Sequence, residues 1–412
     1  MAGSTTVAAG STGGAGASGS PAMAGSSGAP VAGAPSAGAS GAAGSMSTPP
    51  AEDAKGCGET KLLAVPEDPG AVGPWPVGVK TAKLMTPSGP TNVEVWYPAQ
   101  PGSEAGKDKT KYDLSAWLPP MDRTKIPATE NEPQPCNCYR DLPIDTAHGP
   151  YPPVIFVHGL ASFRTGSLTT MTQWASRGFI VVAADHLGNY LLDFSAGLCG
   201  GGGSGAVGDM NADVDAELAA LNAKSGDFSF LGSSIDMTRV GISGHSMGAM
   251  TVSSASRKPN VQAVILMAEL GGSPVPSSSS LKQVLVIGGM IDTVTQWSAD
   301  VSAYSGSPMP KRLVGITGGD HLDVTDICSQ TNAKGETSID VGTRNSVCAL
   351  GIVSGLAHCG SMQDPKQGPG IVNYVSTAVL EEVLHCADRK AVLADDVVKK
   401  KFSALGDYEH TP

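Results

Sequence analysis

Charged and aromatic residues are scarce in this chain. Of its 412 residues, 16% are charged and 5% are aromatic, and the formal net charge is −11. Basic residues cluster nowhere beyond Lys399-Lys400-Lys401 near the C-terminus, so no nucleic-acid partner is expected. The chain also lacks a run of the roughly 18 apolar residues that a membrane-spanning helix needs. These absences exclude nucleic-acid-binding and membrane-spanning proteins from the expected classes.

Residues 1–50 contain no charged and no aromatic side chain, and consist mostly of Gly, Ala, Ser, Thr and Pro. Such a stretch cannot bury enough apolar surface to offset the entropy of ordering it. We predict a disordered tether over residues 1–55, with a cleaved leader as the equal alternative. Met1 is followed by neither the basic nor the apolar region of a signal peptide. The remaining chain predicts a catalytic domain over residues 56–395 and a tail over residues 396–412.

Cysteine is present in an even number, without the spacing of a zinc site or a C-x-x-C pair. This pattern favours an exported, disulfide-bonded protein whose leader has been removed, secreted or periplasmic and tethered to a surface through its N-terminal segment. A cytoplasmic enzyme with free thiols is the alternative. The pairing cannot be read from the sequence, but Cys136 and Cys138 are expected not to pair, because so short a ring is strained. The eight cysteines are Cys57, Cys136, Cys138, Cys199, Cys328, Cys348, Cys359 and Cys386.

Apolar runs of strand length alternate with helical patterns along the chain. Strands are predicted at residues 92–97, 154–157, 179–184, 240–243, 263–267, 284–287 and 313–316. Helices are predicted at residues 168–177, 210–221 and 372–384 and directly after residue 246, and residues 98–150 are expected to be irregular. This alternation predicts an α/β fold with a mostly parallel sheet and helices on both faces. In such sheets ligands bind at the carboxyl ends of the strands.

The pattern G-x-S-x-G stands directly after one of these strands. Gly244, His245, Ser246, Met247 and Gly248 follow the apolar run at residues 240–243 and precede helix-forming residues. A strand, a sharp turn and a helix form the context in which this pattern lifts a serine hydroxyl clear of the sheet. A side chain at either glycine would crowd the turn. Ser246 is therefore the predicted nucleophile.

A serine hydroxyl needs a base that accepts its proton, and in G-x-S-x-G enzymes the acid precedes the histidine in the chain. Asp292 follows the strand at residues 284–287, and His321 follows the strand at residues 313–316. We predict His321 as general base and then acid, and Asp292 as the group that orients it. Asp320, beside the histidine, is the competing acid.

The oxyanion of the transition state needs preorganised hydrogen-bond donors. The backbone N–H of Met247 is one predicted donor, and the N–H of Leu160, in the loop after residues 154–157, is the other. His158 is expected to brace this loop, and His245 is expected to pack beside the nucleophile.

Neither a metal nor a cofactor is expected. Asp320, Asp323 and Asp326 lack the glycine and glutamate of a calcium loop, so they are predicted to be solvated. The glycines at residues 200–203 have no helix with which to hold a phosphate, and we interpret them as a flexible loop near the site.

Four stretches carry a resemblance to a known family. They are Val93–Ala99, Tyr151–Leu160 with Phe163-Arg164, Arg177–His186 and Ile235–Gly248. With these motifs the chain resembles a bacterial branch of the α/β hydrolases, the platelet-activating-factor acetylhydrolase and dienelactone-hydrolase-like esterases, which neighbour the cutinase-like polyester hydrolases. The resemblance covers about residues 82–384. It implies a carboxylic-ester hydrolase that needs no cofactor, with Ser246, Asp292 and His321 as its triad.

The chain departs from the polyester hydrolases at two places. Leu160 stands where an aromatic residue is common in that group, and residues 268–280 contain no tryptophan. A monomeric serine carboxylesterase acting on small-molecule esters is therefore the first hypothesis, and a cutinase-like or PET-hydrolase-like polyester depolymerase is the second. A non-catalytic binding module on the same fold is the alternative from another class. The long segment between His321 and the closing helix is expected to fold over the rim of the site.

Overall fold

The computed structural model describes residues 52–200 and 208–412. The expected tether over residues 1–55 lies almost wholly outside the described residues, as do residues 201–203 of the glycine run. The strands are β1 (Asp53–Lys55), β2 (Lys61–Leu63), β3 (Val77–Thr86), β4 (Gly89–Pro98), β5 (Lys111–Tyr112), β6 (Gln134–Pro135), β7 (Tyr139–Arg140), β8 (Pro153–Val157), β9 (Ile180–Ala184), β10 (Val240–His245), β11 (Val261–Met267), β12 (Gln283–Gly289), β13 (Lys311–Ile316) and β14 (Leu405–Thr411).

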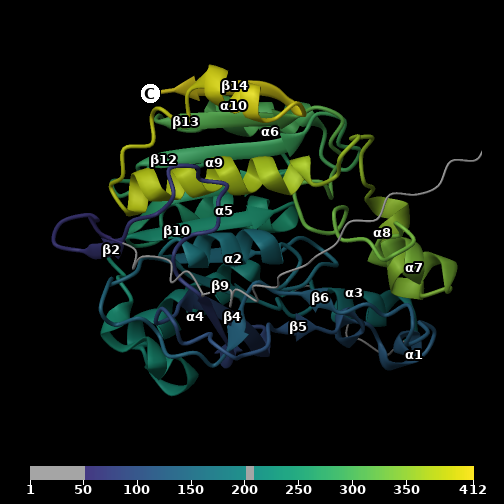
Figure 1. Cartoon of the computed structure of the whole chain (residues 1–412). Coiled ribbons are helices and arrows are strands. Elements are labelled where there is room, and N and C mark those ends of the chain that lie inside the picture. Colours follow the sequence, from purple (N-terminus) through teal and green to yellow (C-terminus); the bar gives the residue numbers. More distant parts are fainter. Residues whose placement is uncertain (1–51, 201–207) are drawn as a thin grey trace, which may run out of the picture. The chain divides into compact units, whose positions relative to one another are not determined.

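Helices occupy most of the connections between these strands (Figure 1). The helices are α1 (Pro120–Arg123), α2 (Leu168–Ser176), α3 (Leu191–Leu198), α4 (Met210–Ala223), α5 (Met247–Ala255), α6 (Trp297–Gly306), α7 (Ser338–Arg344), α8 (Cys348–Leu356), α9 (Gln367–Leu384) and α10 (Asp395–Lys401), with the 3-10 helices η1 (Leu114–Trp117) and η2 (Gly226–Ser234). The segment at residues 98–150, expected to be irregular, thus contains several short elements.

A ten-stranded sheet forms the centre, in the order β14-β13-β12-β11-β10-β8-β9-β4-β3-β7. The strands from β13 to β9 in this order pair in parallel, while β14, β4 and β3 are attached antiparallel. The chain passes from β8 to β9 on one side and then to β10 on the other. The loops after β8 and β10 therefore leave the sheet at a topological switch point, where open α/β sheets bind ligands.

The two faces of the sheet are covered by different helices. Helices α2 and α9 pack on one face, and α4, α5 and α6 pack on the other. Alternate residues of one strand enter different cores, because successive side chains of a strand point to opposite faces. In β8, Val154 and Phe156 enter the core beneath α2 and α9, whereas Ile155 and Val157 enter the core beneath α5. The predicted α/β fold is confirmed.

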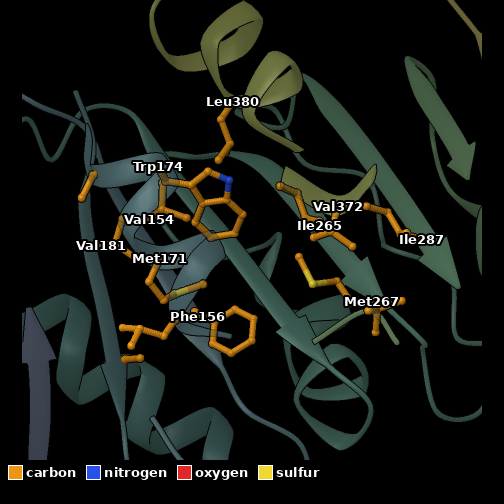
Figure 2. Packing of buried hydrophobic residues seen from close by; sticks show 14 of the residues in the cluster. Val154, Phe156, Met171, Trp174, Val181, Ile265, Met267, Ile287, Val372 and Leu380 are labelled. Carbon is orange, nitrogen blue, oxygen red and sulfur yellow. The ribbon is translucent and has the colours of Figure 1, made fainter. Parts of the chain in front are cut away.

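Figure 2 shows the core beneath α2 and α9 at close range. Trp174 and Met171 of α2 and Leu380 of α9 extend toward Val154 and Phe156 of β8. All five are at most 1% exposed. Full burial of such a side chain contributes roughly 1.5–3 kcal/mol. This core holds the sheet rigid beneath the loops that follow its carboxyl ends.

The C-terminal residues do not form a separate tail, contrary to the expectation for residues 396–412. They form α10 and then β14, which pairs antiparallel with β13 from Lys311↔Thr411 to Ile316↔Leu405. Tyr408 of β14 is 5% exposed, and its hydroxyl donates a hydrogen bond to the Leu393 carbonyl at 2.8 Å. The strand was missed because its sequence, LGDYEHT, carries only a weak alternation of apolar and polar residues. At the other end, residues 53–55 of the expected tether form β1, paired with β2.

All eight cysteines form disulfides. The pairs are Cys57–Cys386, Cys136–Cys138, Cys199–Cys348 and Cys328–Cys359. Cys136 and Cys138 were expected not to pair, and the disulfide between them shows that this expectation is wrong. The chain bends at Asn137, between β6 and β7, and brings the two Cα atoms to 5.1 Å, within the usual disulfide range. None of the helices in residues 52–200 and 208–412 has the length and hydropathy that crossing a bilayer requires.

Candidate active site

Ser246 stands at the turn between β10 and α5, with φ 57° and ψ −120°. A positive φ is rare for a residue with a side chain and costs free energy unless the surroundings enforce it. Here the close packing around Gly244 and Gly248, each two residues from Ser246, holds the backbone in this conformation. A Cβ atom on Gly248 would lie 2.1 Å from the Val157 carbonyl oxygen, and one on Gly244 would lie 2.4 Å from the Gly248 backbone. The turn can form only because β8 and α5 approach β10 without intervening side chains.

The three residues predicted as a triad lie in one hydrogen-bonded line. His321 Nε2 is 2.9 Å from Ser246 Oγ, and His321 Nδ1 is 2.9 Å from Asp292 Oδ2. Each of the three is at most 6% exposed. Ser246 follows β10, Asp292 follows β12 and His321 follows β13, so the parallel strands bring them to the same edge of the sheet. A base adjoining a hydroxyl, itself oriented by a carboxylate, is the arrangement that can activate a serine.

Asp292 is held by four donors. Its Oδ1 accepts from the amides of Val294 and Thr295 at 2.8 and 2.7 Å, and its Oδ2 accepts from Thr295 Oγ1 at 2.8 Å as well as facing His321. Burial raises the pKa of Asp292, but the His321 hydrogen bond and charge and the Thr295 donors outweigh it and leave the pKa below its ordinary value. The carboxylate therefore stays ionised and aligned with the imidazole.

Asp320, the competing acid, faces elsewhere. Its Oδ1 accepts from the Thr293 amide at 2.8 Å and from the His321 amide at 2.7 Å. These bonds join the Asp292 loop to the His321 loop through the backbone. The structure thus brings Asp292, and not Asp320, to the imidazole ring.

Asp320, Asp323 and Asp326 are buried, at 5%, 2% and 1% exposure, so the expectation that they are solvated is wrong. The Asp323 carboxylate accepts from the amides of Asp320 and Gly360, and Asp326 accepts from the amide and hydroxyl of Thr169. Burial raises the pKa of Asp326 to about 6, although the Thr169 bonds oppose the shift. Backbone amides and the Thr169 hydroxyl thus donate hydrogen bonds to these carboxylates. The described residues contain no cluster suited to a metal ion.

The loop after β8 passes directly over Ser246. A Cβ atom on Gly159 would lie 3.1 Å from Ser246 Cβ, tighter than ordinary packing, so glycine lets the loop approach this closely. Among the hydrogen bonds of the described residues, none uses the amide of Leu160 or of Met247. Leu160 lies in the loop after β8, Met247 is the first residue of α5, and both adjoin the turn at Ser246, where their amides are free to bind an oxyanion.

His158 braces this loop. Its Nε2 accepts from the His186 amide at 3.0 Å, which assigns the proton to Nδ1, and Nδ1 donates to the Gly159 carbonyl at 2.8 Å. Burial, with the nearby His186, lowers the pKa of His158 to about 3. The imidazole is therefore neutral and acts as a fixed link from β9 to the glycine.

His245 has a role that the sequence did not reveal. Its Nε2 lies 3.0 Å from the carbonyl oxygen of His321, so a neutral ring donates a proton there. Burial and the adjoining His321 lower the pKa of His245 to about 3. The residue before the predicted nucleophile thus joins the backbone of the predicted base to the turn at Ser246. A histidine at that position was the only available signal, and it was interpreted as packing.

Comparisons with known proteins bear on the fold and the family of the chain. Residues 67–191 match the family model described as platelet-activating factor acetylhydrolase, isoform II. The matched residues include β8 and His158 to Leu160 and end before Ser246. A search of curated proteins finds no match. Among solved structures, the chain is similar to a ferulic acid esterase from Streptomyces cinnamoneus, with a TM-score of 0.52 and 19% identity over 76% of this chain and 91% of that one.

The fold and the family match define the class. The molecule is an esterase-like α/β hydrolase, as the resemblance predicted, because its sheet order, helix layers and residues 67–191 all fit that class. The matched family indicates a carboxylic-ester hydrolase.

Proposed function

We propose that the protein is a serine carboxylesterase that works through an acyl-enzyme intermediate. The hydrogen-bonded line from Ser246 through His321 to Asp292, at a turn with positive φ, is the observation that carries the proposal. This arrangement makes an otherwise weak hydroxyl nucleophilic.

Each step follows from the positions of these groups. His321 Nε2 takes the proton of Ser246 as the oxygen bonds to the ester carbonyl carbon, and the carbonyl becomes an oxyanion between the amides of Leu160 and Met247. Asp292 stabilises the imidazolium. His321 then returns the proton to the departing alcohol, which breaks the ester bond and leaves the acyl group on Ser246. A water molecule, deprotonated by His321, releases the acid by the same route.

Apolar side chains surround the acid loop at the same edge. Ile291 and Val294, on either side of Asp292 in the chain, are 48% and 37% exposed. Met250, one turn beyond the nucleophile on α5, is 40% exposed. Exposed apolar groups in the acid loop and on the helix that begins at the candidate nucleophile favour esters with apolar substituents over strongly charged ones. They also keep a polyester surface as the second candidate substrate.

We propose further that the protein is exported. Its four disulfides include Cys57–Cys386, which joins the beginning of the described residues to the end of α9. Disulfides in this number persist in oxidising compartments. A monomer held to a surface through the low-complexity segment before β1 is the arrangement we propose. Thiol counting in protein isolated from its source tests the oxidised state.

Hydrolysis of p-nitrophenyl esters from acetate to palmitate tests the activity. Ser246→Ala should abolish turnover, whereas Ser254→Ala, a serine on the exposed side of α5, should behave as wild type. If the wild type and Ser246→Ala are folded and equally inert, the non-catalytic alternative holds. If they are equally active, Ser246 is not the nucleophile. A polyester film as an additional substrate distinguishes the two candidate substrates.

A further inference from the structure

A cavity of about 450 Å³ lies at the same edge of the sheet as Ser246 but is not lined by the triad. Its floor consists of Phe163 and Gly166, which follow β8, and Leu191, which follows β9. One wall is the segment at residues 114–135, and the other is the segment at residues 326–350, which follows β13 and includes α7. The cavity therefore opens among the loops that continue from the oxyanion loop and from His321.

The first wall is fastened firmly to the scaffold. Trp117 stacks on Phe163 with ring centroids 4.7 Å apart, and its Nε1 donates to Asp185 at 3.1 Å. Arg164, the next residue after Phe163, lies over the Trp117 ring at 4.9 Å and pairs with Asp185. Asp185 directly follows β9. These contacts tie the wall to the central sheet through the loop that carries Leu160.

The second wall is fastened to the first wall and to α3. Glu130 pairs with Arg344 of α7 at 3.1 Å and accepts from Asn345 at 3.0 Å. The Cys199–Cys348 disulfide joins the end of α3 to α8, and α7, α8 and α3 lie together at one end of the sheet (Figure 1). The cavity is thus preformed, which is typical of ligand sites.

The chemistry of the lining limits what the cavity can hold. Its apolar part includes Leu114, Leu118, Ile126, Leu191, Val341 and Leu350. Its charged part consists of Glu130, Glu132, Asp326 and Glu336 against Lys366. Hydrogen bonds from Asn345 and Asn332, together with Arg344, lower the pKa of Glu130 and of Glu336, so both stay ionised. An anionic group is therefore disfavoured. Because Arg344 already pairs with both Glu130 and Glu336, and most of the lining surface is apolar, a neutral apolar group is favoured.

We propose that this cavity binds a neutral, apolar group of the ester substrate. The inference rests on the proposed esterase function and gives it a substrate class: esters with one bulky apolar substituent. At about 30 Å³ per water-sized volume, 450 Å³ accommodates on the order of 15 non-hydrogen atoms. The neutral, apolar group can belong to either side of the ester bond, that is, to the acyl chain or to the alcohol.

Matched esters distinguish the two sides. p-Nitrophenyl octanoate against p-nitrophenyl acetate varies the acyl side, and octyl acetate against ethyl acetate varies the alcohol side. Ile126→Trp fills the cavity from a half-buried position and should reduce kcat/KM for one long ester about 10-fold more than for its short partner. Met121→Trp, on the same wall but 68% exposed and outside the lining, should leave both ratios unchanged. Leu114→Phe serves as a second filling variant if Ile126→Trp does not fold.

An active, folded filling variant with both ratios unchanged overturns the proposal. A binding measurement separates this failure from failure of the esterase function. Titration of Ser246→Ala with 1-octanol should give saturable heat that Ile126→Trp weakens at least about 10-fold and Met121→Trp does not. If the wild type shows no turnover of any ester but octanol binding is retained, the esterase function alone is contradicted. If octanol binds to neither the wild type nor Ser246→Ala, the cavity proposal is contradicted.

Discussion

The elbow around Ser246 and the walls of the cavity perform adjoining tasks but are held in different ways. At the elbow, Gly244 and Gly248 let the strands and the helix meet backbone to backbone, and a side chain at either position would clash with backbone atoms. The cavity walls are instead fastened by a disulfide, by the Glu130–Arg344 ion pair and by Trp117 stacked on Phe163. Steric exclusion fixes the first region, and cross-links between distant segments fix the second.

This difference indicates which region can vary in sequence without loss of the reaction and which cannot. A reacting oxygen must be positioned within a fraction of an ångström, and backbone packing of a sheet edge supplies that precision. A substrate pocket tolerates variation in its walls, because apolar contact is non-directional. Substitutions at the elbow should therefore affect the reaction as a whole, and substitutions in the walls should affect stability or substrate choice.

The largest expected effect belongs to the elbow. Ser246→Ala and His321→Ala should each lower kcat by about 10⁴–10⁶-fold, and the double variant should lose little more, because the residues act as one unit. Steady-state hydrolysis of p-nitrophenyl butyrate measures it. Losses of His321→Ala and Ser246→Ala that multiply in the double variant would contradict the proposed unit.

The same substitution, glycine to alanine, should have opposite effects at the elbow and on α8, the helix that continues from the second cavity wall. In Gly248→Ala the new methyl carbon meets the Val157 carbonyl oxygen at 2.1 Å, so the protein should lose about 3 kcal/mol or more of stability or fail to fold. In Gly351→Ala, on α8, nothing lies within 4 Å of the new atom, and the helix should gain roughly 0.5–1 kcal/mol. Denaturant unfolding of both variants measures the contrast. Equal losses would show that the walls are as closely packed as the elbow.

Removal of a cross-link should loosen the cavity walls without disturbing the elbow. Cys199→Ser with Cys348→Ser should lower the free energy of unfolding by about 2–4 kcal/mol, because the bond closes a long loop. Under folding conditions, the rate with p-nitrophenyl acetate should change by less than about twofold. Thermal unfolding and acetate turnover are the two measurements. A parallel loss of acetate turnover would mean that the two regions are one structural unit.

The smallest effect should be a pH dependence beneath the cavity. Burial raises the pKa of Asp326 from 3.8 to about 6, so the folded protein keeps the proton at a pH where the unfolded chain has released it. Stability is therefore lost as the pH rises through this window. From about pH 4.5 to about pH 7, wild type should lose about 2 kcal/mol relative to Asp326→Asn, at 1.36 kcal/mol per pKa unit. Denaturant unfolding of both proteins at both pH values measures this difference. If the free energies of unfolding of wild type and Asp326→Asn change equally with pH, the pKa of Asp326 is not raised in the folded protein.

The sequence by itself determined the sheet and located the candidate catalytic residues along the chain. Val240-Gly241-Ile242-Ser243 before Gly244-His245-Ser246 is a local signal, because a buried strand and a tight turn both depend on neighbouring residues. Asp292 and His321 could be located because each follows a strand, and parallel strands end at one edge. In the structure Asp292, His321 and Ser246 form one hydrogen-bonded line, and their catalytic roles stay a prediction.

Only the tertiary structure decided what depends on segments far apart in the chain. The strand at residues 405–411, the bond from His245 to the His321 carbonyl and the burial of Asp323 and Asp326 all lack a local pattern. The cavity is the extreme case, since its floor, its two walls and the disulfide behind them come from separate segments. Local preferences fix strands, turns and helices, whereas the packing of distant side chains fixes which of their polar and apolar groups meet.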